Sequence, residues 1–239
     1  EQITQIDGIQ NITVQKAVWS EISFDEDTLN DFMRIAYEDS SYLSQGESYE
    51  EMVNQLKSYA ETGNYGCFVV TLDESIVAQY NETHDRPIDL EAFRRGDLAI
   101  VGNDTGHNAP NAALAGKTLT LTADSADGKS ADFLIGGAFT FEDYDPRAGV
   151  GSRKHIEIVP QVIYVSEAGM EKLTQTAIIY NIGIDAADYN QLQEIDKQLQ
   201  DINRTLTASD WVYNSSVSML EEFNQMFYSI NLLGNGAAI

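Results

Sequence analysis

The chain has few positive charges, few prolines and almost no cysteine. Its 239 residues include 14 Lys and Arg against 38 Asp and Glu, which gives a formal net charge of −24. Such an excess of negative charge repels phosphate backbones and anionic lipid headgroups. The composition therefore argues against a nucleic-acid reader and against a polybasic membrane binder, but the acidity alone identifies no partner.

A single cysteine excludes an internal disulfide, although it does not decide the cellular compartment. That residue, Cys67, lies in the apolar run 65–70, which predicts a buried structural thiol. The chain also lacks an initiator Met, a signal-peptide pattern and an uninterrupted apolar stretch of about 18 residues. It begins in an amphipathic pattern and grows more apolar towards its end. We therefore expect both ends to be cuts in a longer chain.

Hydrophobic residues make up 43% of the chain and aromatic residues 10%, enough to fill one large core or two small ones. The first part predicts the order βααβ. β-branched residues over 11–22 predict a strand, Asp25 or Asp27 is expected to cap the helix that follows, and apolar spacing over 49–59 predicts a second helix. The Cys67 run completes this part as a strand.

The middle of the chain predicts strands, and its last third alternates strands with helices. Residues 116–122 alternate cleanly, Asp127-Gly128 is a hairpin-turn signal, and residues 133–141 predict the returning strand. Further along the chain, Ser166 is expected to cap a short helix. The remaining predicted elements are strands over 156–165, 177–184 and 211–213 and helices over 192–202 and 220–230.

This order predicts an α+β fold class with two subdomains. Residues 1–87 and 161–239 are expected to form a discontinuous mixed α/β subdomain, and residues 88–160 an inserted β-rich subdomain.

No motif predicts a catalytic, cofactor-binding or metal-ligating residue. Residues 111–118 end in Gly116-Lys117-Thr118 like a phosphate-binding loop, but Asn111 stands where that loop needs glycine, and a strand follows instead of a helix. The glycine-containing segment 149–154 is interpreted as a connection between strands. Histidines 84, 107 and 155 have no second ligand at metal-binding spacing.

The acidic and aromatic residues leave alternatives open. The acidic groups at 25–27, 124–128 and 142–145 do not continue as calcium loops and are interpreted as caps and turns. A hydrolase with paired carboxylates stays open, because the spacing that matters there is spatial. Six tyrosines could form a glycan- or peptide-binding face, although their spacing favours packing: Tyr37, Tyr42, Tyr49, Tyr59, Tyr65 and Tyr80.

Four segments, taken in order, resemble a known family. They are a helical turn, glycine and apolar strand over 88–101, a glycine and alternating strand over 114–121, a strand with an apolar-glycine step over 133–139, and a strand leading into a helix over 162–166. This order resembles the extracytoplasmic domain of MacB/FtsX-type ABC transporter permeases. The resemblance continues through 180–184 and the helix over 192–202.

The resemblance implies a non-enzymatic module on the extracytoplasmic side of the cell membrane. It implies no cofactor, and it implies as partners a separate cytoplasmic ATPase, a second permease copy and an unidentified substrate or protein outside the membrane. The expected contact surface is the insert, with its loops at 102–110 and 143–154. The alternative is a free-standing secreted domain that binds glycan or peptide.

Overall fold

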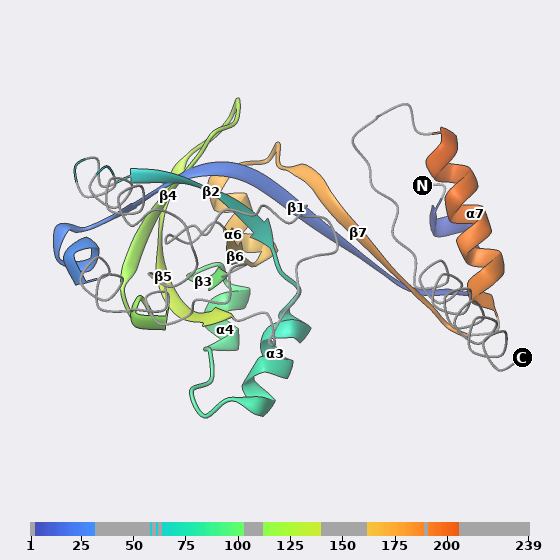
Figure 1. Ribbon diagram of the computed structural model, residues 1–239, viewed down its shortest axis with the longest axis horizontal. Helices are drawn as coiled ribbons and strands as arrows, with labels where there is room; N and C mark the ends of the chain where they lie inside the picture. The colour runs from blue at the N-terminus through green and yellow to red at the C-terminus, as the bar shows by residue number, and fades with distance from the viewer. Residues whose placement is uncertain are drawn as a thin grey trace, which may run out of the picture. The chain divides into compact units, whose positions relative to one another are not determined.

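The computed structural model describes residues 3–31, 58, 61, 64–102, 112–139, 162–188 and 191–205. In chain order the elements are η1 (Ile3–Gln5), β1 (Ile9–Phe24), β2 (Asn64–Thr71), α3 (Glu74–Thr83), α4 (Leu90–Arg94), β3 (Leu98–Gly102), β4 (Thr118–Ala123), β5 (Ser130–Phe139), β6 (Val162–Val165), α6 (Glu167–Leu173), β7 (Ile178–Ala186) and α7 (Leu192–Thr205). Strands dominate this α+β fold, as Figure 1 shows.

Six of the strands close into a barrel. Their order is β2-β6-β3-β5-β4-β1, and β1 pairs back onto β2, while β7 lies beyond β1 in the same sheet. The pairs β2–β6 and β3–β5 are parallel, and the other pairs of the barrel are antiparallel. Closure removes the free edges that an open sheet of these strands would expose.

The chain divides into two compact units, each described here by itself. The barrel unit is the continuous segment Val14–Asn181. The terminal unit combines Glu1–Thr13 with Ile182–Ile239, of which the structure describes 3–13, 182–188 and 191–205. The strands β1 and β7 both continue from one unit into the other.

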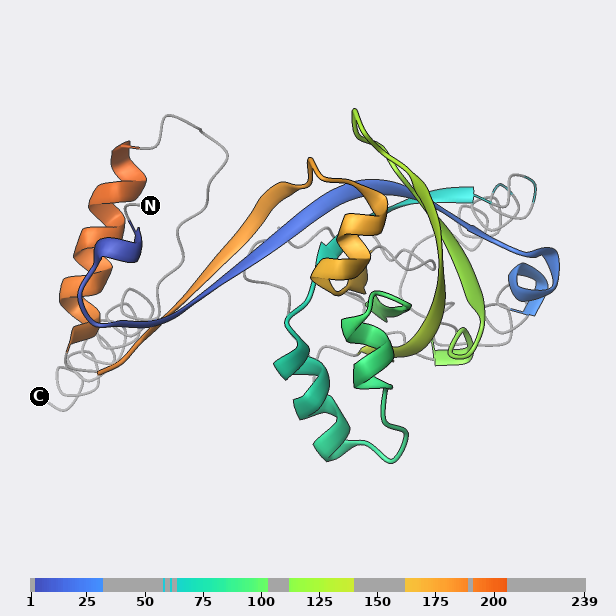
Figure 2. The ribbon, with the colours of Figure 1, turned by 180° about the vertical axis from the view of Figure 1, so that it is seen from behind.

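The barrel interior is filled by side chains from all six strands and from α6. Alternate residues point inwards, as the strand period requires. The interior cluster includes Val18 and Ile22 of β1, Cys67 of β2 and Leu121 of β4, with Met170 of α6 packed among them. A second cluster lies outside the barrel wall, where α3 and α4 cover β2, β3 and β6 (Figure 2). The strands β3 and β6 are therefore buried on both faces.

In the terminal unit, Gly8 adopts a left-handed backbone conformation that favours glycine. Its φ is +90°, and its carbonyl accepts a 2.8 Å hydrogen bond from the backbone N–H of Ala187. The helix α7 buries Ile195 on the stripe that the sequence predicted. None of the described helices combines the length and the apolar character needed to cross a membrane.

Most predicted elements that fall on described residues are confirmed. The strands β1, β2, β4, β5 and β7 and the helices α6 and α7 lie where they were expected, and Ser166 caps α6 by accepting a 3.1 Å hydrogen bond from the Gly169 N–H. The helix α3 was not predicted. The helix over 49–59 and the elements over 211–230 lie outside the described residues, apart from single helical positions at 58 and 61.

The expected subdomain boundaries at 88 and 160 do not separate the strands of the barrel. The strands β3, β4 and β5 come from the segment expected as an insert, yet they share one sheet with β1, β2 and β6. The physical reason is that strands of the expected insert pair with strands outside it. The strand β5 pairs with both β4 and β3, and β6 pairs with both β3 and β2, so the barrel closes only with all six strands.

Two glycines with positive φ provide a matched stability test. Gly96 has φ +76°, and an added Cβ would lie 2.5 Å from the backbone N of Gly169, whereas Gly116 has φ +83° and open space around it. We expect Gly116→Ala to lower the free energy of unfolding by about 1 kcal/mol through backbone strain. We expect Gly96→Ala to lower it by about 3 kcal/mol, because overpacking adds to the strain.

Urea denaturation followed by circular dichroism measures both changes, with the unsubstituted chain as the reference. An equal decrease in the free energy of unfolding for Gly96→Ala and Gly116→Ala would contradict the close approach of Gly96 to α6.

Candidate functional site

Asp127, in the turn between β4 and β5, is surrounded by hydrogen-bond donors. Its carboxylate accepts bonds from the hydroxyl of Thr174, from Thr176 Oγ1 at 2.7 Å, from the backbone N–H of Gln175 at 2.7 Å and from Ser125 Oγ at 3.2 Å. These donors, the Thr174 and Thr176 hydroxyls first, hold the pKa of Asp127 well below its usual range. The carboxylate therefore ties the hairpin turn to the segment that follows α6.

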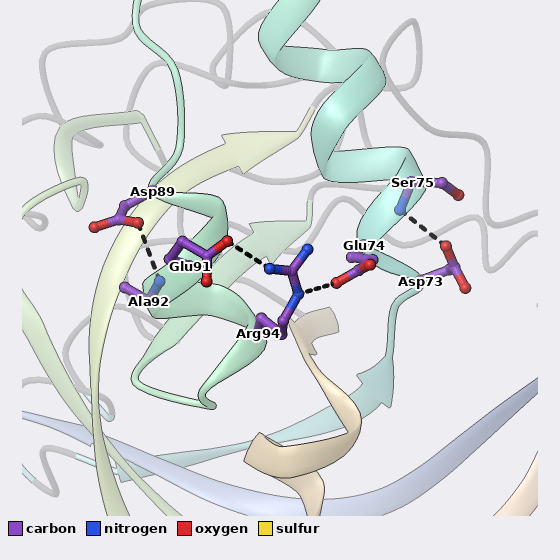
Figure 3. Close-up of polar contacts among 7 residues, drawn as sticks. All are labelled: Asp73, Glu74, Ser75, Asp89, Glu91, Ala92 and Arg94. Carbon is purple, nitrogen blue, oxygen red and sulfur yellow. Dashed lines mark hydrogen bonds and ion pairs between the residues drawn. The ribbon is translucent and has the colours of Figure 1, made fainter.

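A second polar cluster joins α3 to α4 (Figure 3). Arg94, in the last turn of α4, donates from Nε to Glu74 Oε2 at 2.5 Å and from Nη1 to Glu91. The Arg94 hydrogen bond is the main cause of the lowered pKa of Glu74. All three side chains are about half exposed or more, so the ion pairs orient the two helices while contributing little stability.

Both helices in Figure 3 begin at an aspartate cap. Asp73 accepts a 2.8 Å bond from the Ser75 N–H at the start of α3, and Asp89 accepts a 3.0 Å bond from the Ala92 N–H at the start of α4. These bonds satisfy backbone donors that have no partner within the helix.

Lys172 links α6 to the turn between α4 and β3. Its Nζ donates to the Gly96 carbonyl at 2.7 Å and to Asp97 Oδ1 at 3.0 Å, while Arg95 Nε donates to the other oxygen of Asp97 at 3.0 Å. The hydrogen bonds from Lys172 and Arg95 lower the pKa of Asp97.

The clustered carboxylates are suited to accepting hydrogen bonds, not to donating protons. The pKa values of Asp25, Glu74, Asp97 and Asp127 are all lowered, chiefly by hydrogen bonds from neighbouring donors. A general acid at neutral pH needs a raised pKa instead. These four groups therefore stay ionised at neutral pH and act as hydrogen-bond acceptors between neighbouring segments.

The structure confirms the prediction for the single cysteine. Cys67 is fully buried inside the barrel, and burial raises the pKa of its thiol to about 12. A thiol with that pKa stays protonated at neutral pH and is a poor nucleophile.

The described tyrosines and histidine are packing residues. Tyr65 lies in the barrel interior. The Tyr80 ring stacks on His84 with ring centroids 3.8 Å apart, and its centroid lies 4.9 Å from that of Phe139. The other four early tyrosines and the histidines at 107 and 155 lie outside the described residues. So do the expected contact loops at 102–110 and 143–154, apart from Gly102, which ends β3.

Three of the acidic or glycine-containing segments considered as sites fall on described residues, at 25–27, 112–118 and 124–128. The other two, at 142–145 and 149–154, lie outside the described residues. The strand β4 begins at Thr118 directly after Gly116-Lys117, and Lys117 Nζ lies 3.3 Å from Asp31. Asp25, not Asp27, caps the helix that begins at residue 26, and it accepts a 2.7 Å bond from the Thr28 N–H. Within the described ranges, no three His, Cys, Asp or Glu residues gather as a metal site would require.

The strands that run through both units are anchored within each. In the barrel unit, Asn181 donates to Gln15 Oε1 at 3.1 Å, Gln15 Nε2 donates to the Thr71 carbonyl at 3.2 Å, and Lys16 forms an ion pair with Glu167. In the terminal unit, Asn11 donates to Asp185 at 3.4 Å. Sequence reasoning missed these partners because they are separated by 55 to 174 residues along the chain, as the Lys16–Thr71 and Asn11–Asp185 bonds show.

Comparison with known proteins finds no matching family model and no matching curated sequence.

The Asp127 cluster predicts a pH-dependent contribution to stability. Because the folded-state pKa of Asp127 is lowered, its contribution is complete above the ordinary carboxyl pKa, about 3.9, and is lost as the pH falls through the folded-state value. We expect Asp127→Asn to lower the melting temperature by a few degrees at neutral pH. The difference from the unsubstituted chain should shrink as the pH falls below about 4.

Differential scanning calorimetry from neutral to acidic pH measures this difference. Asp124→Asn is the matched control, since Asp124 lies in the same turn and its side chain makes no hydrogen bond with a described residue. A deficit for Asp127→Asn that stays constant over the whole pH range would contradict the role of the charge.

Proposed function

We propose that this chain is the extracytoplasmic domain of an ABC transporter permease of the MacB/FtsX type. In this proposal the domain is non-catalytic and lies on the outer side of the cell membrane. A separate cytoplasmic ATPase drives the membrane helices, and two permease copies pair within the membrane. The domain passes the resulting movement to a substrate or partner outside. The order of the four motifs described above supports this assignment.

The organisation of the chain is the structural observation that carries the proposal. Residues from both ends of the described chain, 3–13 and 182–205, belong to one compact unit, with 189 and 190 undescribed. The barrel unit, Val14–Asn181, is inserted between them. In a permease domain placed between two membrane helices, movement would enter at both ends together and would reach the barrel along β1 and β7.

The anchoring of β1 suits it to pass on such movement. Residues Ala17–Ser23 pair with β2, and Ser20–Phe24 pair with β4. Lys16 adds a backbone hydrogen bond to Thr71 Oγ1 at 2.8 Å. A displacement along β1 would therefore act on two hydrogen-bonded ladders at once, rather than being absorbed by a loop.

Cysteine labelling of the full-length protein tests the proposed location. Ala126 is exposed in the β4–β5 turn, whereas the native Cys67 is fully buried. In intact cells of the source organism, we expect Ala126→Cys to react with a membrane-impermeant maleimide as completely as it does after lysis. The unsubstituted protein is the matched control: its Cys67 is fully buried and should remain unlabelled, and any labelling elsewhere in the protein is subtracted as background.

The gene supplies a second readout. The reading frame should encode apolar stretches of about 20 residues beyond both Glu1 and Ile239. Labelling of Ala126→Cys only after lysis, or a reading frame with a cleaved signal peptide before Glu1 and a stop codon after Ile239, would overturn the permease assignment.

A further inference from the structure

One outer face of the barrel, formed by β2, β1 and β4, carries an exposed aromatic ring beside a carboxylate. Because Val18 and Ile22 point into the interior, the alternation of β1 directs Trp19 and Glu21 outwards. Trp19 is 43% exposed, which is high for so large an apolar side chain, and Glu21 is exposed two residues further along the same strand. The helices α3 and α4 pack in a neighbouring cluster that includes Val70 of β2 and Ala17 of β1, and they leave Trp19 and Glu21 exposed.

The Trp19 ring is held in place by β2. It lies over Gly66, where an added Cβ would come within 2.3 Å of the indole Cζ2 atom. Phe68, directly opposite Trp19 in the β1–β2 ladder, contacts the ring edge-to-face with centroids 4.8 Å apart. A ring fixed in this way loses little conformational entropy when a ligand stacks on it.

The polar groups beside the ring leave one carboxylate available. On β4, the hydroxyl of Thr122 is hydrogen-bonded to Ser130 at 2.8 Å, and the hydroxyl of Thr120 donates to Asp132 at 2.7 Å. Glu21, which lies opposite Thr122, makes no hydrogen bond or ion pair with any residue that the structure describes. The described outward positions of these strands include no Lys or Arg.

We infer that this face binds an arginine or lysine side chain of a cationic polypeptide. The indole supplies a cation–π surface, and Glu21 supplies a carboxylate that only accepts hydrogen bonds, which matches a guanidinium or ammonium group that only donates them. The net charge of −24 attracts a positively charged partner over a longer range. A neutral sugar carries no positive charge for Glu21 to attract, and the chitin oligosaccharide in the test below distinguishes it from a cationic ligand.

The inference goes beyond the proposed permease function and does not depend on it. It concerns the outer face of the barrel in the isolated chain, whereas the permease assignment concerns the location of the full-length protein. Binding measured on the 239-residue chain can therefore fail while the labelling experiment succeeds, and the reverse also holds.

Isothermal titration calorimetry on the 239-residue chain tests the inference. The probe is a blocked arginine–glycine peptide with three arginines, and its control is the same peptide with the neutral analogue citrulline in place of arginine. We expect the arginine peptide to bind in physiological salt and the citrulline peptide not to bind. Glu21→Gln and Trp19→Leu should each weaken binding of the arginine peptide about threefold or more.

The matched control variant is Glu82→Gln on α3, which removes the same charge from another exposed position of the barrel unit. It should leave the dissociation constant nearly unchanged. Glu21→Gln keeps the shape of an exposed side chain, so it remains informative if Trp19→Leu lowers the melting temperature.

Three outcomes would overturn the inference. The first is equal weakening by Glu21→Gln and Glu82→Gln, which would show diffuse charge attraction only. The second is equal binding of the arginine and citrulline peptides. The third is binding of a chitin oligosaccharide that depends on Trp19 while the arginine peptide does not bind, which would assign the face to a glycan.

Discussion

The double pairing of β1 is the constraint on which the rest of the barrel depends. Residues Ser20–Ser23 are hydrogen-bonded to β2 along one edge and to β4 along the other. This pairing closes the barrel and so creates an interior in which Cys67 is fully buried. It also decides which residues face outwards, since a slip of one position would exchange the interior Val18 for Trp19.

Local features of this fold could be predicted from the sequence, because they depend on neighbouring residues. The alternation over 116–122 and the serine before α6 predicted a strand and a helix cap that the structure contains, the strand as β4. Closure of the barrel could not be predicted, because it depends on pairs such as Phe68 with Val162, which are far apart in the chain. The expected boundaries at 88 and 160 followed a change in composition, and composition does not specify which strands pair.

The candidate binding face, too, could be predicted only in part from the sequence. Alternation along β1 places Trp19 and Glu21 on one face as soon as the strand is recognised. Their exposure could not be foreseen, because it depends on where α3 and α4 pack: these helices cover Val70 further along β2 but leave Trp19 43% exposed. The contribution of Gly66 also required the register of β1 with β2, which places the glycine beneath the ring.

The acidic residues fall into two groups: some accept hydrogen bonds from neighbouring donors, and others, such as Asp124 and Glu21, have no side-chain partner among the described residues. Asp73 and Asp89 cap helices, and Asp127 accepts four hydrogen bonds, so local donors offset part of the repulsion that a charge of −24 creates. Glu21 has no such partner within the described residues, although it lies on the strand that closes the barrel. Under the proposed function, β1 also continues into the terminal unit, so one strand would connect the ends of the domain with its candidate binding face. A partner bound at Trp19 and Glu21 would then contact the strand whose hydrogen-bonded ladders with β2 and β4 would also receive movement from the membrane.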